Sequence, residues 1–231
     1  MCCIDRLKSQ PKADIGSALY LSMKLTVISD THNQHEQFGI LSGEVLIHCG
    51  DMFNLFSKKD GELESIDDWF GRQKFDLILC TGGNHDSALE EQLNVVDEPF
   101  QNAVYLQDRA YIHDGINFYG APWTPELAGQ AFYREGSELE RVWQSIPANV
   151  DVLITHTPPA GILDVSSRGL ELGCQYLAKQ LRVVNPRVHC FGHVHASSGT
   201  QITESTTYIN ASSVNSQFEL TRRPYEVEIR D

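Results

Sequence analysis

Short apolar runs bounded by polar or turn-forming residues recur along most of the chain. Six of these runs lack helical spacing and predict buried strands: 24–29, 44–49, 75–80, 116–119, 151–155 and 187–191. Two later runs, 206–210 and 225–229, are rich in β-branched and aromatic residues and predict strands that close a sheet. Residues 1–22, in contrast, show little apolar periodicity before the first strand opens at Met23.

Segments with helical spacing separate several of the predicted strands. The clearest are 61–73, 136–146 and 169–183, and in the first of them Leu63, Ile66, Trp69 and Phe70 mark one apolar face. Strands that alternate with helices indicate an α/β fold. A chain of 231 residues needs no second core. We therefore expect one domain over residues 23–231 and a dispensable extension over residues 1–22.

Composition narrows the possible partners. The chain carries 18 basic and 31 acidic residues, a net charge of −13, which is the wrong sign for binding a long phosphate backbone. We therefore expect no extended nucleic-acid partner. No run approaches the ~18 apolar residues of a membrane span, and the N-terminus lacks the order of a signal peptide. The sequence thus predicts a cytoplasmic protein without a membrane partner.

The cysteines support the same location. They occur at Cys2, Cys3, Cys49, Cys80, Cys174 and Cys190, without a C-x-x-C pair that would indicate a zinc ribbon or redox motif. Several lie in or beside apolar runs, where a reduced cysteine packs as a small core residue. Free thiols of this kind are typical of a reducing compartment.

Histidine, aspartate and asparagine side chains gather directly after five of the predicted strands. In chain order they are Asp30 and His32, Asp51, Asn84 and His85, His156, and finally His193 and His195. Loops at the carboxyl ends of strands in an α/β sheet converge on one crevice. On an extended backbone, Asp-x-His and His-x-His would each present two side chains on the same side. Glycines precede Asp51, Asn84 and His193, where they allow sharp turns and a close approach of the backbone.

These side chains are of the types that bind divalent ions. Mixed carboxylate, imidazole and amide donors suit manganese, iron or zinc, and one carboxylate can bridge two ions. Two ions about 3.5–4 Å apart polarise phosphoryl oxygens and activate water for in-line attack. His85 is not needed as a ligand, and its ordinary pKa near neutrality makes it the candidate to protonate the leaving oxygen.

The same ordered set of motifs resembles the calcineurin-like metallophosphoesterase superfamily over nearly the whole chain from Met23. The resemblance implies a four-layer α/β sandwich in which two mixed β-sheets are flanked by helices. It also implies that a first ion is held by Asp30, His32 and His195, and a second by Asn84, His156 and His193. Asp51 would bridge the two ions, and His85 would contact the scissile phosphate or act as the acid.

A narrower resemblance lies in the segments 119–125, 155–159 and 208–212. They are similar to small metallophosphoesterase-domain-containing proteins of brain and fetal tissue and their bacterial relatives. That likeness implies phosphodiesterase activity on cyclic nucleotides and related diesters. His193, which some animal members replace, is kept here and predicts a complete second site. The Asp-Arg-Gly sequence of protein Ser/Thr phosphatases is missing downstream of Asp51.

We therefore expect a metal-dependent phosphodiesterase that acts on small phosphodiesters such as cyclic nucleotides, with a hydroxide held between two ions as nucleophile. Manganese is favoured over iron and zinc. One alternative is a phosphomonoesterase, including a protein phosphatase. The alternative from another class is a non-catalytic regulatory or scaffold protein that binds a nucleotide.

Some neighbouring residues keep two interpretations. Asn33, together with Asn84 and His85, is a candidate substrate contact, or it is a polar turn residue. Asp86 either orients His85 or caps the helix that follows it. Trp123 either stacks on a nucleobase or packs in the core. Arg168 either reaches a phosphate or lies in a solvated loop.

The remaining histidines lack a ligand pattern. His48 and His189 fall within apolar strands and are expected to be core residues. His35 and His113 are expected in loops or at the surface, with a cleft position for His35 as the alternative.

Overall fold

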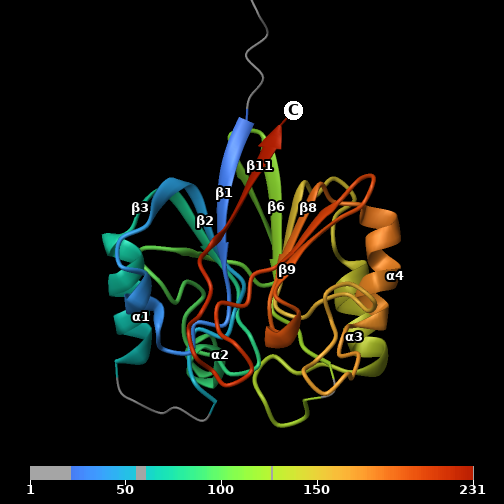
Figure 1. Ribbon diagram of the computed structural model, residues 1–231, viewed down its shortest axis with the longest axis horizontal. Helices are drawn as coiled ribbons and strands as arrows, with labels where there is room; N and C mark the ends of the chain where they lie inside the picture. The colour runs from blue at the N-terminus through green and yellow to red at the C-terminus, as the bar shows by residue number, and fades with distance from the viewer. Residues whose placement is uncertain (1–21, 56–60, 126, 231) are drawn as a thin grey trace, which may run out of the picture.

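The computed structural model describes residues 22–55, 61–125 and 127–230. Two mixed sheets form its centre (Figure 1). The first sheet contains, in spatial order, β11 (Tyr225–Arg230), β1 (Ser22–Ile28), β2 (Ser42–His48), β3 (Lys74–Cys80) and β4 (Val104–Tyr105). Within it β1 to β4 are parallel, and β11 runs antiparallel to β1.

The second sheet has the order β5 (Arg109–His113), β6 (Ile116–Ala121), β7 (Val152–Thr155), β8 (Val188–Phe191), β10 (Thr207–Asn210) and β9 (Gly199–Ile202). Its four central strands are parallel, and the edge strands β5 and β9 are antiparallel to their neighbours. Parallel strands need crossover connections, and this is why helices lie between them in the chain.

Helices cover the outer faces of the two sheets. Figure 1 shows α1 (Glu62–Arg72) outside the first sheet, and α3 (Gly136–Gln144) and α4 (Gln175–Val184) outside the second. The short α2 (Ser87–Gln92) follows β3, and two 3-10 turns, η1 (His35–Phe38) and η2 (His195–Ser197), follow β1 and β8. The predicted four-layer α/β sandwich is therefore confirmed.

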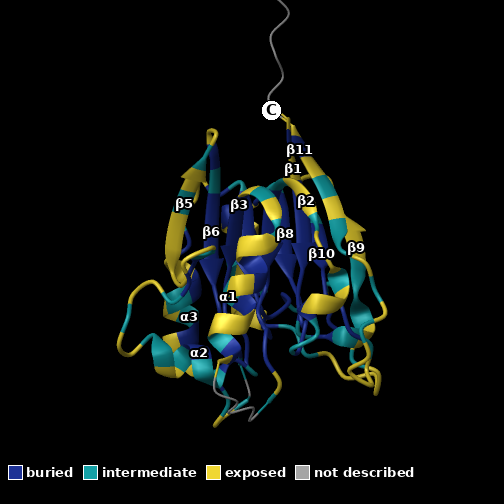
Figure 2. Ribbon diagram, turned by 90° about the vertical axis from the view of Figure 1, so that its left-hand side faces the viewer, coloured by how far each residue is buried: buried dark blue, intermediate teal, exposed yellow. Residues whose placement is uncertain are grey.

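Two apolar layers hold the sheets in place. Between the sheets, Val27 and Ile47 of the first pack in one cluster with Phe118 and Ile154 of the second. On the outer faces, the predicted apolar face of α1 is buried, and Trp143 of α3 and Leu177 of α4 are buried likewise. The central strands are buried on both faces as a result, as Figure 2 shows, and they therefore read as continuous apolar runs.

The sequence missed elements whose pattern is weak. The two edge strands of the second sheet, β5 and β9, are largely exposed, so apolar and polar positions do not alternate clearly along them. The helix expected over 169–183 begins at Gln175, because the N–H groups of Leu172 and Cys174 before it donate to the Asp164 and Pro158 carbonyls instead. Residues 1–21 lie outside the described residues, so the dispensable extension stays a prediction.

Two further expectations were wrong. His35 lies in η1 and is buried against Trp69, with ring centroids 5.7 Å apart, instead of at the surface or in the cleft. His113 is a half-buried residue of β5 instead of a loop residue. The prediction that cysteines pack as reduced core residues holds for Cys49, Cys80 and Cys190, which are buried free thiols, and Cys174 is buried as well. No helix among the described residues is long and apolar enough to cross a membrane.

Candidate metal centre

The polar side chains that follow the strands come together at the carboxyl edge of both sheets. Asp30 and His32 follow β1, Asp51 follows β2, and Asn84 and His85 follow β3, all from the first sheet. His156 follows β7, and His193 and His195 follow β8, from the second sheet. His156 Nε2 lies 3.4 Å from Asp51 Oδ1, so the two sheets meet at one site.

The backbone at these positions is turned instead of extended. Asp30, His32, Asp51 and His193 all have positive φ, between 43° and 70°. Residues other than glycine adopt this left-handed backbone conformation at a cost of about 1–3 kcal/mol, and residues strained in this way cluster at functional sites. The expectation that Asp-x-His and His-x-His are extended was therefore wrong, although Asp30 and His32 still lie in one group of possible ligands. His193 and His195 instead point to different parts of the site.

At two glycines the neighbouring carboxylates lie so close to the backbone that no side chain would fit. A Cβ atom at Gly83 would collide with the carboxylate of Asp51, and one at Gly192 would collide with the carboxylate of Asp30. The glycines before Asn84 and His193 thus let neighbouring loops pack directly on the buried carboxylates.

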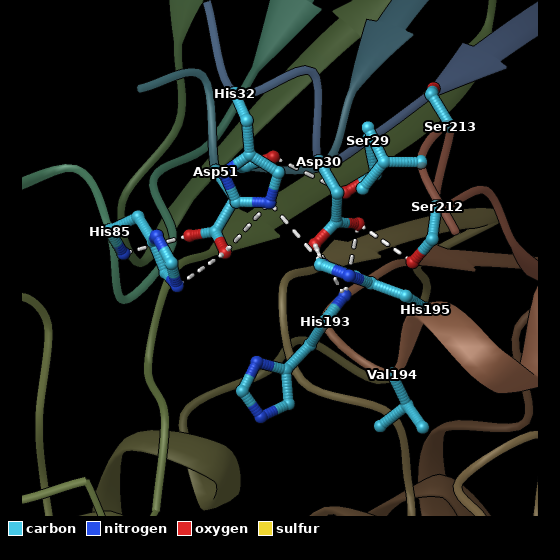
Figure 3. A network of polar contacts seen from close by, with 12 residues as sticks. Ser29, Asp30, His32, Asp51, His85, His193, Val194, His195, Ser212 and Ser213 are labelled. Carbon is cyan, nitrogen blue, oxygen red and sulfur yellow. Dashed lines mark hydrogen bonds and ion pairs between the residues drawn. The ribbon is translucent and has the colours of Figure 1, made fainter. Parts of the chain in front are cut away.

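The first half-site consists of Asp30, His32 and His195 (Figure 3). His195 Nε2 lies 3.2 Å from Asp30 Oδ1 and 3.3 Å from His32 Nε2. The Nδ1 atom of His32 lies 3.0 Å from the Phe53 carbonyl oxygen. A carbonyl only accepts, so Nδ1 carries the proton of the neutral ring and Nε2 presents a lone pair to the site.

The second half-site consists of Asn84, His156 and His193. Asn84 Oδ1 lies 3.0 Å from His156 Nε2 and 2.9 Å from His193 Nδ1. The His156 ring is fixed in the same way as His32, because its Nδ1 lies 2.8 Å from the Cys49 carbonyl oxygen. Its Nε2 lone pair therefore also faces the site.

Asp51 lies between the half-sites and is buried. Its Oδ1 is 3.4 Å from His156 Nε2, and its Oδ2 is 4.0 Å from His32 Nε2. One carboxylate oxygen thus faces each half-site, as a bridging ligand requires.

The donor set fits divalent ions. In each half-site imidazole nitrogens and other acceptor atoms face one another at close range, an arrangement that needs a proton or a metal ion between them. Ligand bonds of 2.0–2.2 Å place two ligand atoms on one ion about 3.0–3.5 Å apart. The contacts from 2.9 to 3.4 Å within the two half-sites match this spacing.

The electrostatics of the site also favour cations. Burial opposes charge on Asp30 and Asp51, yet the histidines around them hold the pKa of each carboxyl below its usual value. Burial lowers the pKa of His156, but the Asp51 carboxylate more than offsets this and raises it to about 9. At His193 burial outweighs the attraction of the Asp51 and Asp30 carboxylates and lowers the pKa to about 4. A proton on His156 occupies the same negative potential that would hold a metal ion.

His85 lies beside the half-sites rather than within them. Its Nε2 is 3.8 Å from Asp51 Oδ2, and its backbone N–H donates to Asp51 Oδ1 at 2.8 Å. Its Nδ1 is buried and has no hydrogen-bond partner among residues 22–55, 61–125 and 127–230. Because Nδ1 is enclosed, Nε2 is the nitrogen that can meet a substrate, and His85 also forms a possible ligand group with His32 and Asp51.

Asp86 neither orients His85 nor caps α2 with its side chain. Its side chain makes no hydrogen bond to the amides of α2. Instead its carboxylate accepts the backbone N–H groups of Asp51, Phe53 and Gly83, at 2.9, 3.0 and 2.9 Å. Asp86 therefore ties the loop that carries Asp51 to the loop that carries Asn84.

The other residues with two interpretations resolve differently. Asn33 donates its amide to Glu62 Oε1 at 2.8 Å, so it is held beside the site by α1. Trp123 is buried, donates to Asp108 and lies under the Arg134 guanidinium, and is therefore a packing residue. Arg168 is exposed in the loop after β7.

Sequence reasoning missed three residues that contact the site. Gln130 Oε1 accepts the Asn84 amide at 2.6 Å, which turns the Asn84 carbonyl oxygen toward the histidines. Ser212 donates to Asp30 Oδ2 at 2.8 Å. The ring of Phe218 lies against His32 and His195. All three are in loops distant in sequence, and only Ser212 had a signal, since it ends the Asn-Ala-Ser motif at 210–212.

Comparison with known proteins agrees with this geometry. The calcineurin-like phosphoesterase family profile matches residues 23–197. A UPF0046 protein of Caenorhabditis elegans is 34% identical over 217 residues, which cover 87% of this chain and 73% of that protein. Human metallophosphoesterase domain-containing protein 1 is 30% identical over 232 residues, which cover 89% of this chain and 71% of that protein.

Solved structures share the fold. One crystal structure superposes with a TM-score of 0.60 at 16% identity, over 82% of this chain and 90% of its own. GAP50, the anchor in the inner membrane complex of Plasmodium, has a TM-score of 0.50 at 12% identity, over 83% of this chain and 72% of its own. Given the profile match, the curated relatives and the converging His/Asp cluster, the chain belongs to the calcineurin-like phosphoesterase family, hydrolases that act on phosphoric ester bonds with divalent metal ions.

Proposed function

We propose that this protein is a phosphodiesterase that hydrolyses small phosphodiesters, cyclic nucleotides among them. The observation that carries the proposal is the convergence of lone pairs from Asn84, His156 and Asp51 on one side and from His32 and His195 on the other. Asp30, His32 and His195 would hold one ion, Asn84, His156 and His193 the other, and Asp51 would face both. Bound divalent ions supply Lewis-acid polarisation of the phosphoryl oxygens and lower the pKa of water.

The chain's own residues then orient the ester. His85 lies 3.8 Å from Asp51, at the rim of both half-sites, and is placed to give a proton to the departing oxygen. The neighbouring Asn84 and Asn33 are the further proposed substrate contacts. Because Asn33 already donates to Glu62, a substrate would share this amide or displace Glu62 from it.

The charge of the site favours a diester over a monoester. A diester carries one negative charge and a monoester up to two. Among the described residues, the hydrogen bonds and ion pairs of the candidate ligands and His85 involve no lysine or arginine. The nearby Arg222 guanidinium instead donates to the carbonyls of Ser212 and Val214.

Manganese is our proposed ion. Imidazole, carboxylate and amide oxygen together form a borderline-to-hard donor set, without the thiolates that select zinc in structural sites. Among the described cysteines, Cys49 comes closest to the site and contributes only its carbonyl oxygen, to His156. The proposed cytoplasmic location is supported by the buried free thiols, which are typical of a reducing compartment.

The test compares two chromogenic esters. Protein freed of metal with a chelator and reloaded with manganese should turn over bis(p-nitrophenyl) phosphate faster than p-nitrophenyl phosphate. The His85→Ala variant should lose about 10²-fold in turnover while still binding two ions, because general-acid catalysis contributes about that much. Calorimetric titration with Mn²⁺ measures the ions bound. If the reloaded protein binds two ions but hydrolyses neither ester, the enzymatic proposal is wrong.

A further inference from the structure

Phe218 is an aromatic residue placed at the mouth of the metal centre. Its ring centroid lies 4.9 Å from that of His32, 5.1 Å from that of His195 and 6.0 Å from that of His85. It therefore touches two candidate ligands of the first half-site and the candidate acid. Nevertheless 46% of the residue stays exposed, so the ring forms an apolar wall beside the place where an ester would bind.

The loop around Phe218 fixes the ring in this position. Asn215 Oδ1 accepts the backbone N–H groups of Gln217 and Glu219, at 2.9 and 3.0 Å, and the Phe218 N–H donates to the Asn215 carbonyl at 3.0 Å. Phe218 itself has φ 60°, a conformation that is uncommon for a bulky side chain. The loop thus holds a strained residue because several hydrogen bonds determine its shape.

A second attachment comes from the site itself. Gln34 Nε2 donates to the Phe218 carbonyl oxygen at 2.9 Å, and Gln34 lies two residues after the candidate ligand His32. The loop that carries His32 therefore also positions Phe218. The ring is placed before any substrate arrives, and this reduces the ordering that binding would require.

The orientation of the ring leaves room for a planar group. His32 and His195 meet Phe218 at interplanar angles of 66° and 88°, which are edge-to-face contacts, and His85 meets it at 42°. No ring within the described ranges stacks in parallel on Phe218. An aromatic group with its phosphate between the half-sites would extend past His85 and reach the exposed part of this ring.

We propose that Phe218 is a specificity-determining residue that stacks on the aromatic or heterocyclic group of the substrate ester. The inference rests on the proposed function and deepens it, since it names the class of organic group that the site prefers. Stacking of this kind corresponds to about tenfold in affinity. Small alkyl esters, which offer no π-face, would gain nothing from Phe218.

The experiment uses two ligands that cannot be hydrolysed. Phenylphosphonate and methylphosphonate have the same charged group and differ in the organic group, and calorimetry measures their affinity for the manganese-loaded protein. The unaltered protein should bind phenylphosphonate about tenfold more tightly than methylphosphonate. Phe218→Ala should remove this preference and leave the affinity for methylphosphonate unchanged, whereas Phe218→Tyr should keep it.

The matched control is Ile202→Ala, which removes an exposed apolar side chain on β9, 73% exposed, and should leave the preference intact. Equal loss of both phosphonates in Phe218→Ala, or an unaltered protein without the preference, would overturn the role of Phe218. If neither phosphonate binds the unaltered, metal-loaded protein, the half-sites do not bind a phosphoryl group and the proposed function is wrong. Turnover does not enter these measurements.

Discussion

Behind each half-site a threonine next to a candidate ligand accepts a hydrogen bond from a buried histidine of the neighbouring strand. Thr31, between Asp30 and His32, lies 3.0 Å from His48 Nε2 of β2. Thr155, directly before His156, lies 2.9 Å from His189 Nε2 of β8. His48 Nδ1 accepts the Gly50 N–H at 3.3 Å, so its Nε2 is the donor, and the Thr155 hydroxyl donates onward to the Thr157 carbonyl at 2.8 Å, so His189 Nε2 is the donor as well.

The two half-sites differ on the side that faces the substrate. Phe218 contacts His32 and His195 of the first half-site, whereas a polar residue, Gln130, supports Asn84 of the second. The buried supports are alike because both loops leave parallel strands in the same way. The facing sides differ because each is covered by a loop from another part of the chain. Buried support thus fixes the ligands, and the loops decide what binds in front of them.

The largest expected effect comes from removing what the half-sites share. Asp51→Asn keeps the shape of the side chain but removes the negative charge that faces both half-sites. We expect diester turnover to fall about 10³-fold or more, since metal-centred charge stabilisation contributes several kcal/mol. Calorimetry should also show weaker binding of both ions.

The control for this variant is Asp164→Asn, which alters another buried carboxylate that accepts the Gly161 amide away from the site. It should keep two ions and near-normal turnover. Tight binding of two ions by Asp51→Asn would contradict a bridging role.

The half-sites should be separable by single substitutions. His32→Ala removes a ligand of the first half-site only, and His193→Ala removes a ligand of the second only. Each variant should bind one manganese ion instead of two and lose about 10²-fold in turnover, because one ion no longer helps to stabilise the charge of the transition state. Stoichiometry by calorimetry is the measurement. If either variant loses both ions, the description as two half-sites is wrong.

Gln130 offers a smaller change that affects one half-site. Gln130→Leu removes the acceptor that orients the Asn84 amide, so the Asn84 carbonyl oxygen is no longer fixed toward His156 and His193. The affinity for one ion should fall about tenfold while that for the other stays the same, as is typical of lost outer-shell hydrogen bonds. Gln130→Glu keeps an acceptor and should restore the affinity. Equal weakening of both ions would show instead that the variant disturbs the fold.

The smallest expected effect is on the free energy of unfolding, and it should be the same for His48 behind the first half-site and for His189 behind the second. Burial lowers the pKa of His48 and of His189 to about 3, from an ordinary value near 6.5. Above pH 6.5 both rings are neutral whether the chain is folded or unfolded, so they contribute no pH dependence. As the pH falls below 6.5, the unfolded chain binds protons that the folded chain excludes, and stability is lost until about pH 3.

The slope for one histidine is about 1.4 kcal/mol per pH unit. In metal-free protein, denaturant unfolding between pH 6 and pH 4 should therefore show a slope reduced by that amount in His48→Gln and equally in His189→Gln. The slope is compared instead of the absolute stability, so a general destabilisation does not hide the result. An unchanged slope in one variant would show that the two supports behave differently.

The convergence of the candidate ligands at one edge could be predicted from the sequence, because each of them follows a strand whose apolar run is unmistakable. The predictions of the central strands, the layers and most of the helical segments hold for the same reason, because central strands and amphipathic helices leave strong patterns. The exposed edge strands β5 and β9 leave weak ones and were missed. The role of Asp86 was missed as well, since its partners are backbone amides and sequence spacing does not reveal them.

The sequence by itself thus determined the kind of chemistry: which donors are present, in which order, and at the ends of which strands. The resemblance already implied which donors share an ion, and only the tertiary structure decided how the backbone brings them to it. His193 and His195 are two residues apart, yet a left-handed turn at His193 sends them to different half-sites. Gln130 and Phe218 reach the site through loops without any periodic pattern, because their contacts depend on the path of the whole chain and not on their neighbours in sequence.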